Sequence, residues 1–156
     1  MRNHQASESV SIASSSGLAS WLREANISLA FTTYRANRLL LLGTDTTDKP
    51  QIKLHERLFD RPMGLFVAGE SLWMAARCQI WRLDNRLAPG QLHEGGDRLY
   101  VPAASFTTGE VNAHELVLDA DDQPIFVNTA FSCLATIKPR CSFAPTWAPP
   151  FITQFA

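Results

Sequence analysis

Short apolar or alternating stretches, separated by Gly, Asp, Asn and Pro, run along the chain from position 27 onward. Stretches of this length, rich in branched and aromatic residues and bounded by turn formers, are typical of β-strands. We therefore predict a fold made almost entirely of strands. The predicted strands are Ile27–Thr33, Arg38–Gly43, Gln51–Leu54, Met63–Ala68, Ser71–Ala76, Gln79–Leu83, Leu99–Val101, His114–Leu118, Ile125–Thr129 and Cys133–Ile137.

A different pattern precedes the strands. Residues 1–16 are polar and rich in serine, which predicts a flexible tail. The following segment, Gly17–Ala25, places apolar residues three or four positions apart, as on one face of a helix, with Ser16 as the expected N-cap. These apolar residues are Leu18, Trp21, Leu22 and Ala25.

One block of three predicted strands recurs later in the chain. The offsets between matching positions are 116 − 65 = 51, 125 − 72 = 53 and 134 − 80 = 54. A repeat of this length is the size of one β-propeller blade. We therefore predict an all-β fold in residues 17–156: a partial β-propeller of about two and a half four-stranded blades, with a short N-terminal helix.

The repeat also assigns places to the remaining strands. Ile27–Phe31 and Arg38–Leu42 would be the second and third strands of an earlier blade that lacks its inner strand, and Leu99–Val101 would be an outer strand. The aromatic residues of the strands are expected to pack between blades. Among them are Trp73, Trp81 and Trp147.

Composition narrows the class of protein. A hydrophobic content of 46% and a net charge of −1 are typical of one soluble globular domain. Scattered Lys and Arg argue against nucleic acid as a partner, and no apolar stretch approaches a membrane span. The three widely spaced cysteines, Cys78, Cys133 and Cys141, indicate reduced thiols and hence a cytoplasmic location.

A polar cluster marks the best candidate site. His114 and Glu115 open a predicted inner strand, and inner strands line the channel in which propellers bind ligands. Thr108 and Asn112 lie just before this strand and are expected at the same end. The alternative is that His114 only hydrogen-bonds a neighbouring backbone carbonyl.

Two further residues are candidate ligand-binding positions. Asn128 interrupts an apolar strand where its repeat counterpart is Ala75, so its polarity is particular to one blade. Arg77 follows the equivalent strand and is expected to reach the same end of the channel as an anion contact.

Catalytic and metal motifs are absent from the sequence. There is no G-x-S-x-G and no local Ser-His-Asp signature, so no catalytic residue is assigned. Asp119–Asp122 lacks the Gly and Glu that an EF-hand loop requires and is interpreted as a turn. We expect no metal and no cofactor.

Five segments of the chain carry a resemblance to a known family: Phe59–Leu65, Leu72–Ala75, Gln79–Arg82, Asp97–Pro102 and Pro124–Thr136. Through these segments the chain resembles, over about Ile27 to Ile152, a bacterial family of conserved hypothetical proteins with a propeller-like domain. In its Pro62-x-Gly64-Leu65 and Leu72–Ala75 strands it is more distantly similar to NHL-repeat propellers and gluconolactonases.

The resemblance also points to two differences. Members of that family are about twice as long, which implies that this chain matches the N-terminal half only. Their inner-strand segment is richer in His and Asp, where this chain has Phe106, Asn112 and Glu115. Both differences suggest a shortened copy.

These observations lead to two alternative functions. The first is a non-enzymatic binding or interaction module, or a truncated remnant without activity, that associates with itself through open sheet edges. Its ligand or protein partner is unknown. The second is a metal-dependent lactonase that uses His114, Glu115, Asn112 and Asn128 around a cation.

Overall fold

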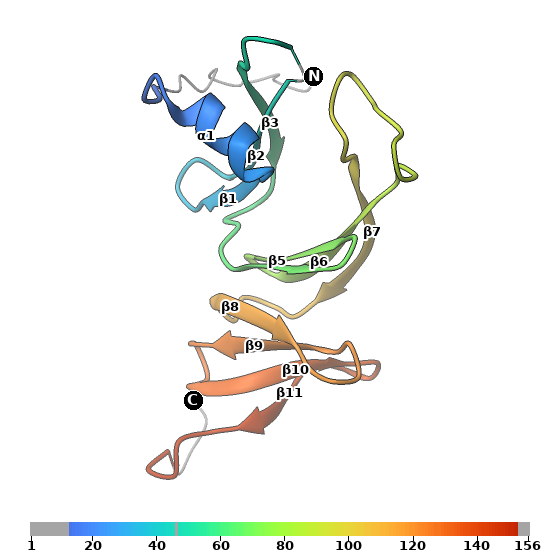
Figure 1. The fold of residues 1–156 in the computed structure, drawn as a ribbon. Coiled ribbons are helices and arrows are strands. Elements are labelled where there is room, and N and C mark those ends of the chain that lie inside the picture. The colour runs from blue at the N-terminus through green and yellow to red at the C-terminus, as the bar shows by residue number, and fades with distance from the viewer. Residues whose placement is uncertain (1–12, 46, 153–156) are drawn as a thin grey trace, which may run out of the picture.

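The structure, a computed structural model, describes residues 13–45 and 47–152. In this part of the chain one helix, α1 (Leu18–Ala25), precedes three open antiparallel sheets (Figure 1). The predicted strand-rich fold with a short N-terminal helix is therefore confirmed, and the partial β-propeller stays a prediction. The tail predicted for residues 1–16 lies mostly outside the described residues.

Each sheet is an up-and-down meander in which neighbouring strands are hydrogen-bonded in chain order. The first sheet contains β1 (Leu29–Thr33), β2 (Arg38–Thr44) and β3 (Ile52–Leu58). The second contains β4 (Leu65–Ala68), β5 (Ser71–Ala76), β6 (Gln79–Asn85) and β7 (Tyr100–Thr107). The third contains β8 (Ala113–Leu118), β9 (Pro124–Asn128), β10 (Cys133–Lys138) and β11 (Cys141–Trp147).

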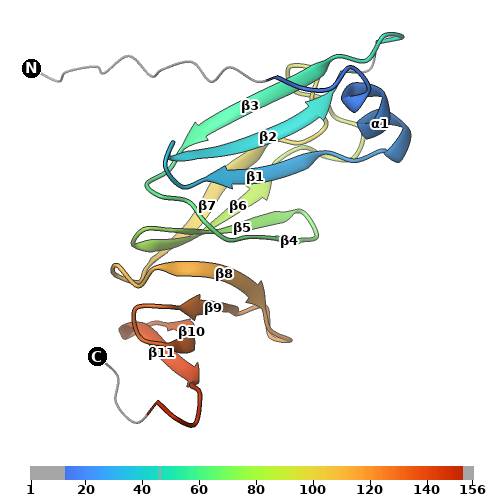
Figure 2. The same ribbon diagram turned by 90° about the vertical axis from the view of Figure 1, so that its left-hand side faces the viewer.

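The sheets follow one another in chain order, from β1–β3 at the top of Figure 2 to β8–β11 at the bottom. β1 contacts β4, and β4 in turn contacts β8, so the first strands of successive sheets are neighbours. β1 therefore occupies a first-strand position. The prediction that Ile27–Phe31 forms a second strand was wrong.

Two apolar clusters hold the sheets together. Between the first and second sheets, Leu39 packs against Leu72 and Met74. Between the second and third sheets, Trp73 shares a cluster with Phe126, among other residues. The side chains of β5 thus alternate between the two interfaces, as expected for a strand buried on both faces.

The register corrects the repeat by one residue. Leu65 pairs with Met74, and its counterpart Leu116 pairs with Phe126, so the middle strands are offset by 126 − 74 = 52 and not 53. The counterpart of Asn128 is therefore Ala76 and not Ala75. A shift of one residue matters because it moves every side chain of a strand to the other face.

The strand predictions missed two parts of the outer edges. β7 continues to Thr107, where Phe106 stacks on the ring of Trp73 with a centroid distance of 6.3 Å. The resemblance had placed Phe106 in an inner-strand segment. In the structure Phe106 belongs instead to β7, the fourth strand of its sheet. β11 was not predicted, because its Pro145 is unusual in a strand.

The helix begins differently from the prediction. Its N-cap is Gly17, not Ser16, and no side chain caps it. Leu22 is fully buried and α1 lies against β2, whereas Trp21 is half exposed. The helix is thus fastened to the first sheet by one face only.

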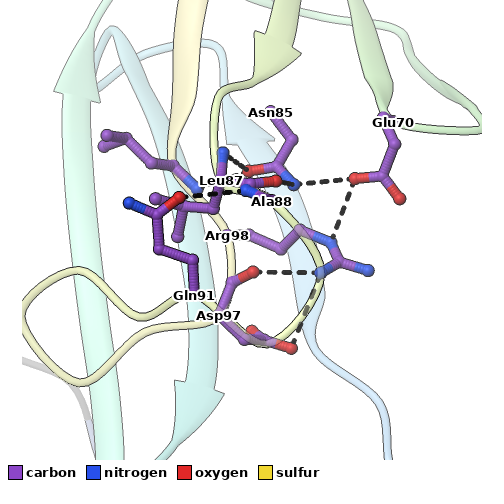
Figure 3. Close-up of polar contacts among 8 residues, drawn as sticks. Glu70, Asn85, Leu87, Ala88, Gln91, Asp97 and Arg98 are labelled. Atoms are coloured by element: carbon purple, nitrogen blue, oxygen red, sulfur yellow. Dashed lines mark hydrogen bonds and ion pairs between the residues drawn. The ribbon is translucent and has the colours of Figure 1, made fainter.

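A polar network orders the long connection between β6 and β7 (Figure 3). Asn85, at the end of β6, donates its side-chain amide to the carboxylate of Glu70 at 2.7 Å. Its Oδ1 accepts from the backbone N–H groups of Leu87, at 3.2 Å, and Leu99, at 2.9 Å. Arg98 reaches the same Glu70 carboxylate at 3.6 Å. One asparagine therefore joins both ends of the connection.

Gly64 brings the second and third sheets into close backbone contact. A Cβ at this position would lie 2.6 Å from the carbonyl oxygen of His114 and 2.7 Å from the Cα of Glu115. Both neighbours are backbone atoms of β8, so they cannot move aside as a side chain end would. Gly64 is thus the position at which β8 lies directly against the start of β4.

We expect Gly64→Ala to lower the free energy of unfolding by about 1–3 kcal/mol, because the added methyl group must push β8 away. Chemical denaturation followed by circular dichroism measures this change. Gly96→Ala is the control, since its Cβ would meet only ordinary contacts, the nearest being the His93 carbonyl oxygen at 3.5 Å. Equal stability of the two variants would contradict the prediction.

Candidate functional site

A cavity of about 440 Å³ opens where the three sheets meet. Tyr34 reaches it from the turn between β1 and β2, and Met63 from the segment before β4. His114 lines it from β8, with Asn112 just before that strand and Thr129 just after β9. The lining therefore combines residues that are far apart in the sequence.

Backbone geometry at the start of β8 positions the polar part of this lining. Asn112 adopts a left-handed conformation with φ of 48°, and its carbonyl oxygen accepts a hydrogen bond from the Thr129 hydroxyl at 2.9 Å. The register of β8 against β9 shifts between Ala113 and Leu116. A bulge of this kind redirects side chains at the end of a strand, here around His114.

An ionic cluster lies in the same region. Glu110 accepts from Arg77 at 2.9 Å and from Arg61 at 3.2 Å, and Arg77 also lies 3.7 Å from Asp60. The guanidinium of Arg61 stands over the ring of Tyr34, 5.8 Å from its centroid. The cluster thus connects the cavity residue Tyr34 to the segment that leads into β8.

The charges of this cluster stabilise one another. The hydrogen bond from Arg77, together with the positive charges of Arg77 and Arg61, lowers the pKa of Glu110. The same hydrogen bond raises the pKa of Arg77. Both shifts favour the charged forms, so Arg77 is engaged by Glu110.

We expect Glu110→Gln to lower the melting temperature at pH 7. A carboxylate whose pKa is lowered in the fold stabilises it above the ordinary value of 4.5, and this contribution is lost as the pH falls through the folded-state pKa. The difference from wild type should therefore shrink below pH 4.5, as measured by differential scanning fluorimetry. Glu24→Gln, on the exposed surface of α1, is the control. A difference that does not shrink as the pH falls below 4.5 would contradict the assignment.

The structure brings only some of the predicted site residues together. His114 and Asn112 line the cavity side by side. Thr108 is buried and donates its hydroxyl to the carbonyl of Gly109 at 3.0 Å, and Glu115 is exposed on β8. Arg77 belongs to the ionic cluster. Neither Thr108, Glu115 nor Arg77 contributes to the cavity lining.

Asn128 lines a second cavity, of about 410 Å³, beside β9 and β10. Its side chain is fully buried, and its Oδ1 accepts from the backbone N–H of Phe131 at 3.1 Å. Its amide nitrogen meets no acceptor among the described residues. The hydrogen bond to Phe131 fixes the turn between β9 and β10, which is a structural role.

We expect Asn128→Ala to destabilise the fold by about 1–3 kcal/mol, because the partly buried N–H of Phe131 loses its acceptor. Urea unfolding followed by fluorescence measures the loss. Asn128→Asp keeps both the acceptor oxygen and the side-chain volume. Comparing the two variants therefore separates the effect of losing the hydrogen bond from the effect of losing volume. If Asn128→Ala is as stable as wild type, the Phe131 contact does not stabilise the turn.

Three cavity residues were missed by sequence reasoning. Tyr34 lies in a turn, Met63 precedes its strand, and Thr129 was taken as the last residue of a strand. A signal for Met63 existed in the repeat, because 114 − 63 = 51 makes it the counterpart of His114. Nothing in the local sequence distinguishes Tyr34 or Thr129 from other turn residues.

Other predicted features can be located as well. Asp119–Asp122 forms a turn in which Oδ1 of Asp119 accepts from the N–H groups of Asp121 and Gln123, each at 2.9 Å. Over residues 13–45 and 47–152, no three His, Cys, Asp or Glu side chains converge as a metal site would require. The described helix is too short to cross a membrane.

Comparison with known proteins gave one match. The model of a family described as a domain of unknown function, DUF4915, matches residues 16–156. Comparisons with curated proteins and with solved structures found no match. The expected membership in a family of uncharacterised proteins is thus confirmed, whereas the likeness to NHL-repeat propellers and gluconolactonases stays a prediction.

Proposed function

Because the chain belongs to the DUF4915 family of domains of unknown function, we propose from its site geometry that it is a non-enzymatic binding module. Its ligand would occupy the cavity beside His114. This proposal rests on the observation that residues from all three sheets line the cavity. Tyr34 comes from the first sheet, Met63 from the segment before the second sheet, and His114 from the third. Small-molecule sites commonly form where such elements converge.

The lining favours a small uncharged ligand. The imidazole of His114 offers polar ring nitrogens, and the hydroxyl of Thr129 retains lone pairs beyond its bond to Asn112. Met63 and the ring of Tyr34 supply apolar contact. The arginines nearby are already paired with Glu110, which offsets part of their positive charge.

We also propose that the three sheets are consecutive blades of a β-propeller. Support comes from the contacts β1–β4 and β4–β8, since first strands are innermost in a propeller blade and line its channel. The cavity adjoins these first strands through His114, which belongs to β8. A ligand there would occupy the position at which propellers commonly bind ligands.

The lactonase alternative has no specific support. It requires His114, Glu115, Asn112 and Asn128 around one cation, but Asn128 lines the second cavity and Glu115 lines neither. We therefore retain the binding module as the proposed function and assign no catalytic residue.

A fragment screen monitored at the imidazole groups tests the proposal. Protein with ¹³C-labelled histidine is titrated with a library of small neutral polar compounds, whose affinities are expected to be about 1 mM. We expect selective shifts of the His114 resonance. The variant His114→Ala should lose the heat of binding measured by calorimetry, whereas His55→Ala, on the exposed strand β3, should retain it.

Two results would contradict the binding module. One is that no compound shifts the His114 resonance at solubility-limited concentrations. The other is that hits bind equally well to His114→Ala and to wild type, which would move the site elsewhere.

A further inference from the structure

The outer edge of the first sheet is a regular strand edge that no described strand covers. β3 pairs with β2 through all seven of its residues without a register shift, and β2 is the only described strand hydrogen-bonded to it (Figure 2). A free edge exposes backbone N–H and C=O groups that can pair with another chain. β3 can therefore accept an additional strand.

The outer edges of the other two sheets are interrupted. β7 contains Pro102 and pairs with β6 through one register shift, and β11 contains Pro145 and pairs with β10 through two. Trp147, which ends β11, is 55% exposed, against the expectation that it packs between blades. Proline cannot donate a backbone hydrogen bond, and bulges twist an edge strand away from a partner. Of the three outer strands, β3 is therefore the best suited to pairing.

One face of β3 has positive charges without a carboxylate beside them. Because side chains alternate along a strand, Lys53, His55 and Arg57 share a face, and all three are exposed. The β2 residues opposite them are uncharged: Gly43, Leu41 and Leu39. We call this side of β2 and β3 the basic face, and its charges are those of Lys53 and Arg57.

Both charges of the basic face are available to a partner. Neither Lys53 nor Arg57 forms an ion pair with a described carboxylate, and the guanidinium of Arg57 donates to the backbone carbonyl of Glu56 at 2.9 Å. Asp45 lies in the loop between β2 and β3. Its pKa is lowered chiefly by a hydrogen bond from the N–H of Gln51 at 3.1 Å, and to a smaller extent by the charge of Lys53. Asp45 is thus fastened to its own loop.

The opposite face of β3 is neutral and largely apolar. Its one charged residue, Glu56, lies 3.1 Å from Arg38 of β2, so the two charges offset each other. Leu54 is partly buried and Leu58 is 63% exposed on either side of this pair. A strand placed beside β3 would therefore meet positive charge on one face and apolar surface on the other.

Two copies of β3 are poorly matched to each other. Residues directly opposite in neighbouring antiparallel strands lie on the same face of the sheet, and like charges in such positions are destabilising. A pair of β3 strands would bring two basic faces together. Self-association through open sheet edges, which we expected from the sequence, is therefore disfavoured at β3. An acidic strand has the complementary charge.

We propose that β3 binds an extended acidic segment of another protein as a fourth strand of the first sheet. Acidic side chains at alternate positions of that segment face Lys53 and Arg57, and apolar side chains between them face Leu54 and Leu58. In this mode of recognition, main-chain hydrogen bonds supply affinity and alternate side chains supply specificity. Lys53 and Arg57 are about 13 Å apart along the strand, so the matching acidic residues are four positions apart.

Fluorescence anisotropy tests this proposal with a labelled seven-residue peptide in which valine alternates with glutamate. Titration of the full chain to roughly 1 mM detects even weak complexes. We expect this peptide to bind and a peptide that alternates valine with lysine not to bind. Arg57→Glu should weaken binding about tenfold, because a favourable cross-strand pair becomes a pair of like charges. The matched control is Arg140→Glu, which changes the net charge equally at an exposed residue between β10 and β11 and should bind like wild type.

Exchanging the charges of the basic face sharpens the test. The double variant Lys53→Glu, Arg57→Glu should bind the valine–lysine peptide and no longer the valine–glutamate peptide. Hydrogen exchange followed by mass spectrometry should show that the valine–glutamate peptide protects residues 52–58 of wild type, and not β7 or β11. Circular dichroism melting ensures that only folded variants are compared.

Three results would overturn the proposal. The first is that the valine–glutamate peptide does not bind wild type, or binds no better than the valine–lysine peptide. The second is equal weakening by Arg57→Glu and Arg140→Glu, because the attraction would then depend on net charge alone. The third is protection of β3 that rises with protein concentration in the absence of peptide, since a second copy would then occupy the edge.

Discussion

The close backbone approach at Gly64 is the contact on which the arrangement of the second and third sheets depends. A glycine lets β8 lie directly against the start of β4, and this places His114 beside Met63 in one cavity. The apolar cluster around Trp73 and Phe126 can form only at this separation. Packing between the sheets and the geometry of the candidate site therefore follow from one residue without a side chain.

The charges near the cavity constrain what the cavity can bind. Glu110 engages both Arg61 and Arg77, which leaves the lining itself dominated by a histidine, neutral polar groups and apolar surface. Exposed ion pairs contribute little to stability individually, but a network that spans several segments also orders the connections between them. The same network that supports the start of β8 thus places paired charges beside the cavity.

Much of the fold was predictable because alternation and turn residues are local signals. The repeat even gave the offsets of the first and third strands correctly, since strongly apolar residues such as Leu65 and Leu116 define them. The middle strand was shifted by one residue, because the counterpart of Leu72 is Pro124 and matching apolar residues selected Ile125 instead. β11 and the full length of β7 were not predicted, because each contains a proline, which is unusual inside a strand. Of the five residues that line the cavity, only Asn112 and His114 come from one local segment, and Tyr34 joins them through tertiary packing alone.

The differences between repeats carry more functional meaning than their similarity. Met63 and His114 occupy equivalent positions before or at the start of a first strand, and both line the cavity, yet one is apolar and the other is polar. Gly64 and Glu115 are likewise equivalent, but only the glycine lies under a neighbouring strand. Where the repeat packs against itself it keeps small or apolar residues. Where it does not, as at His114, it carries a polar residue that lines the cavity.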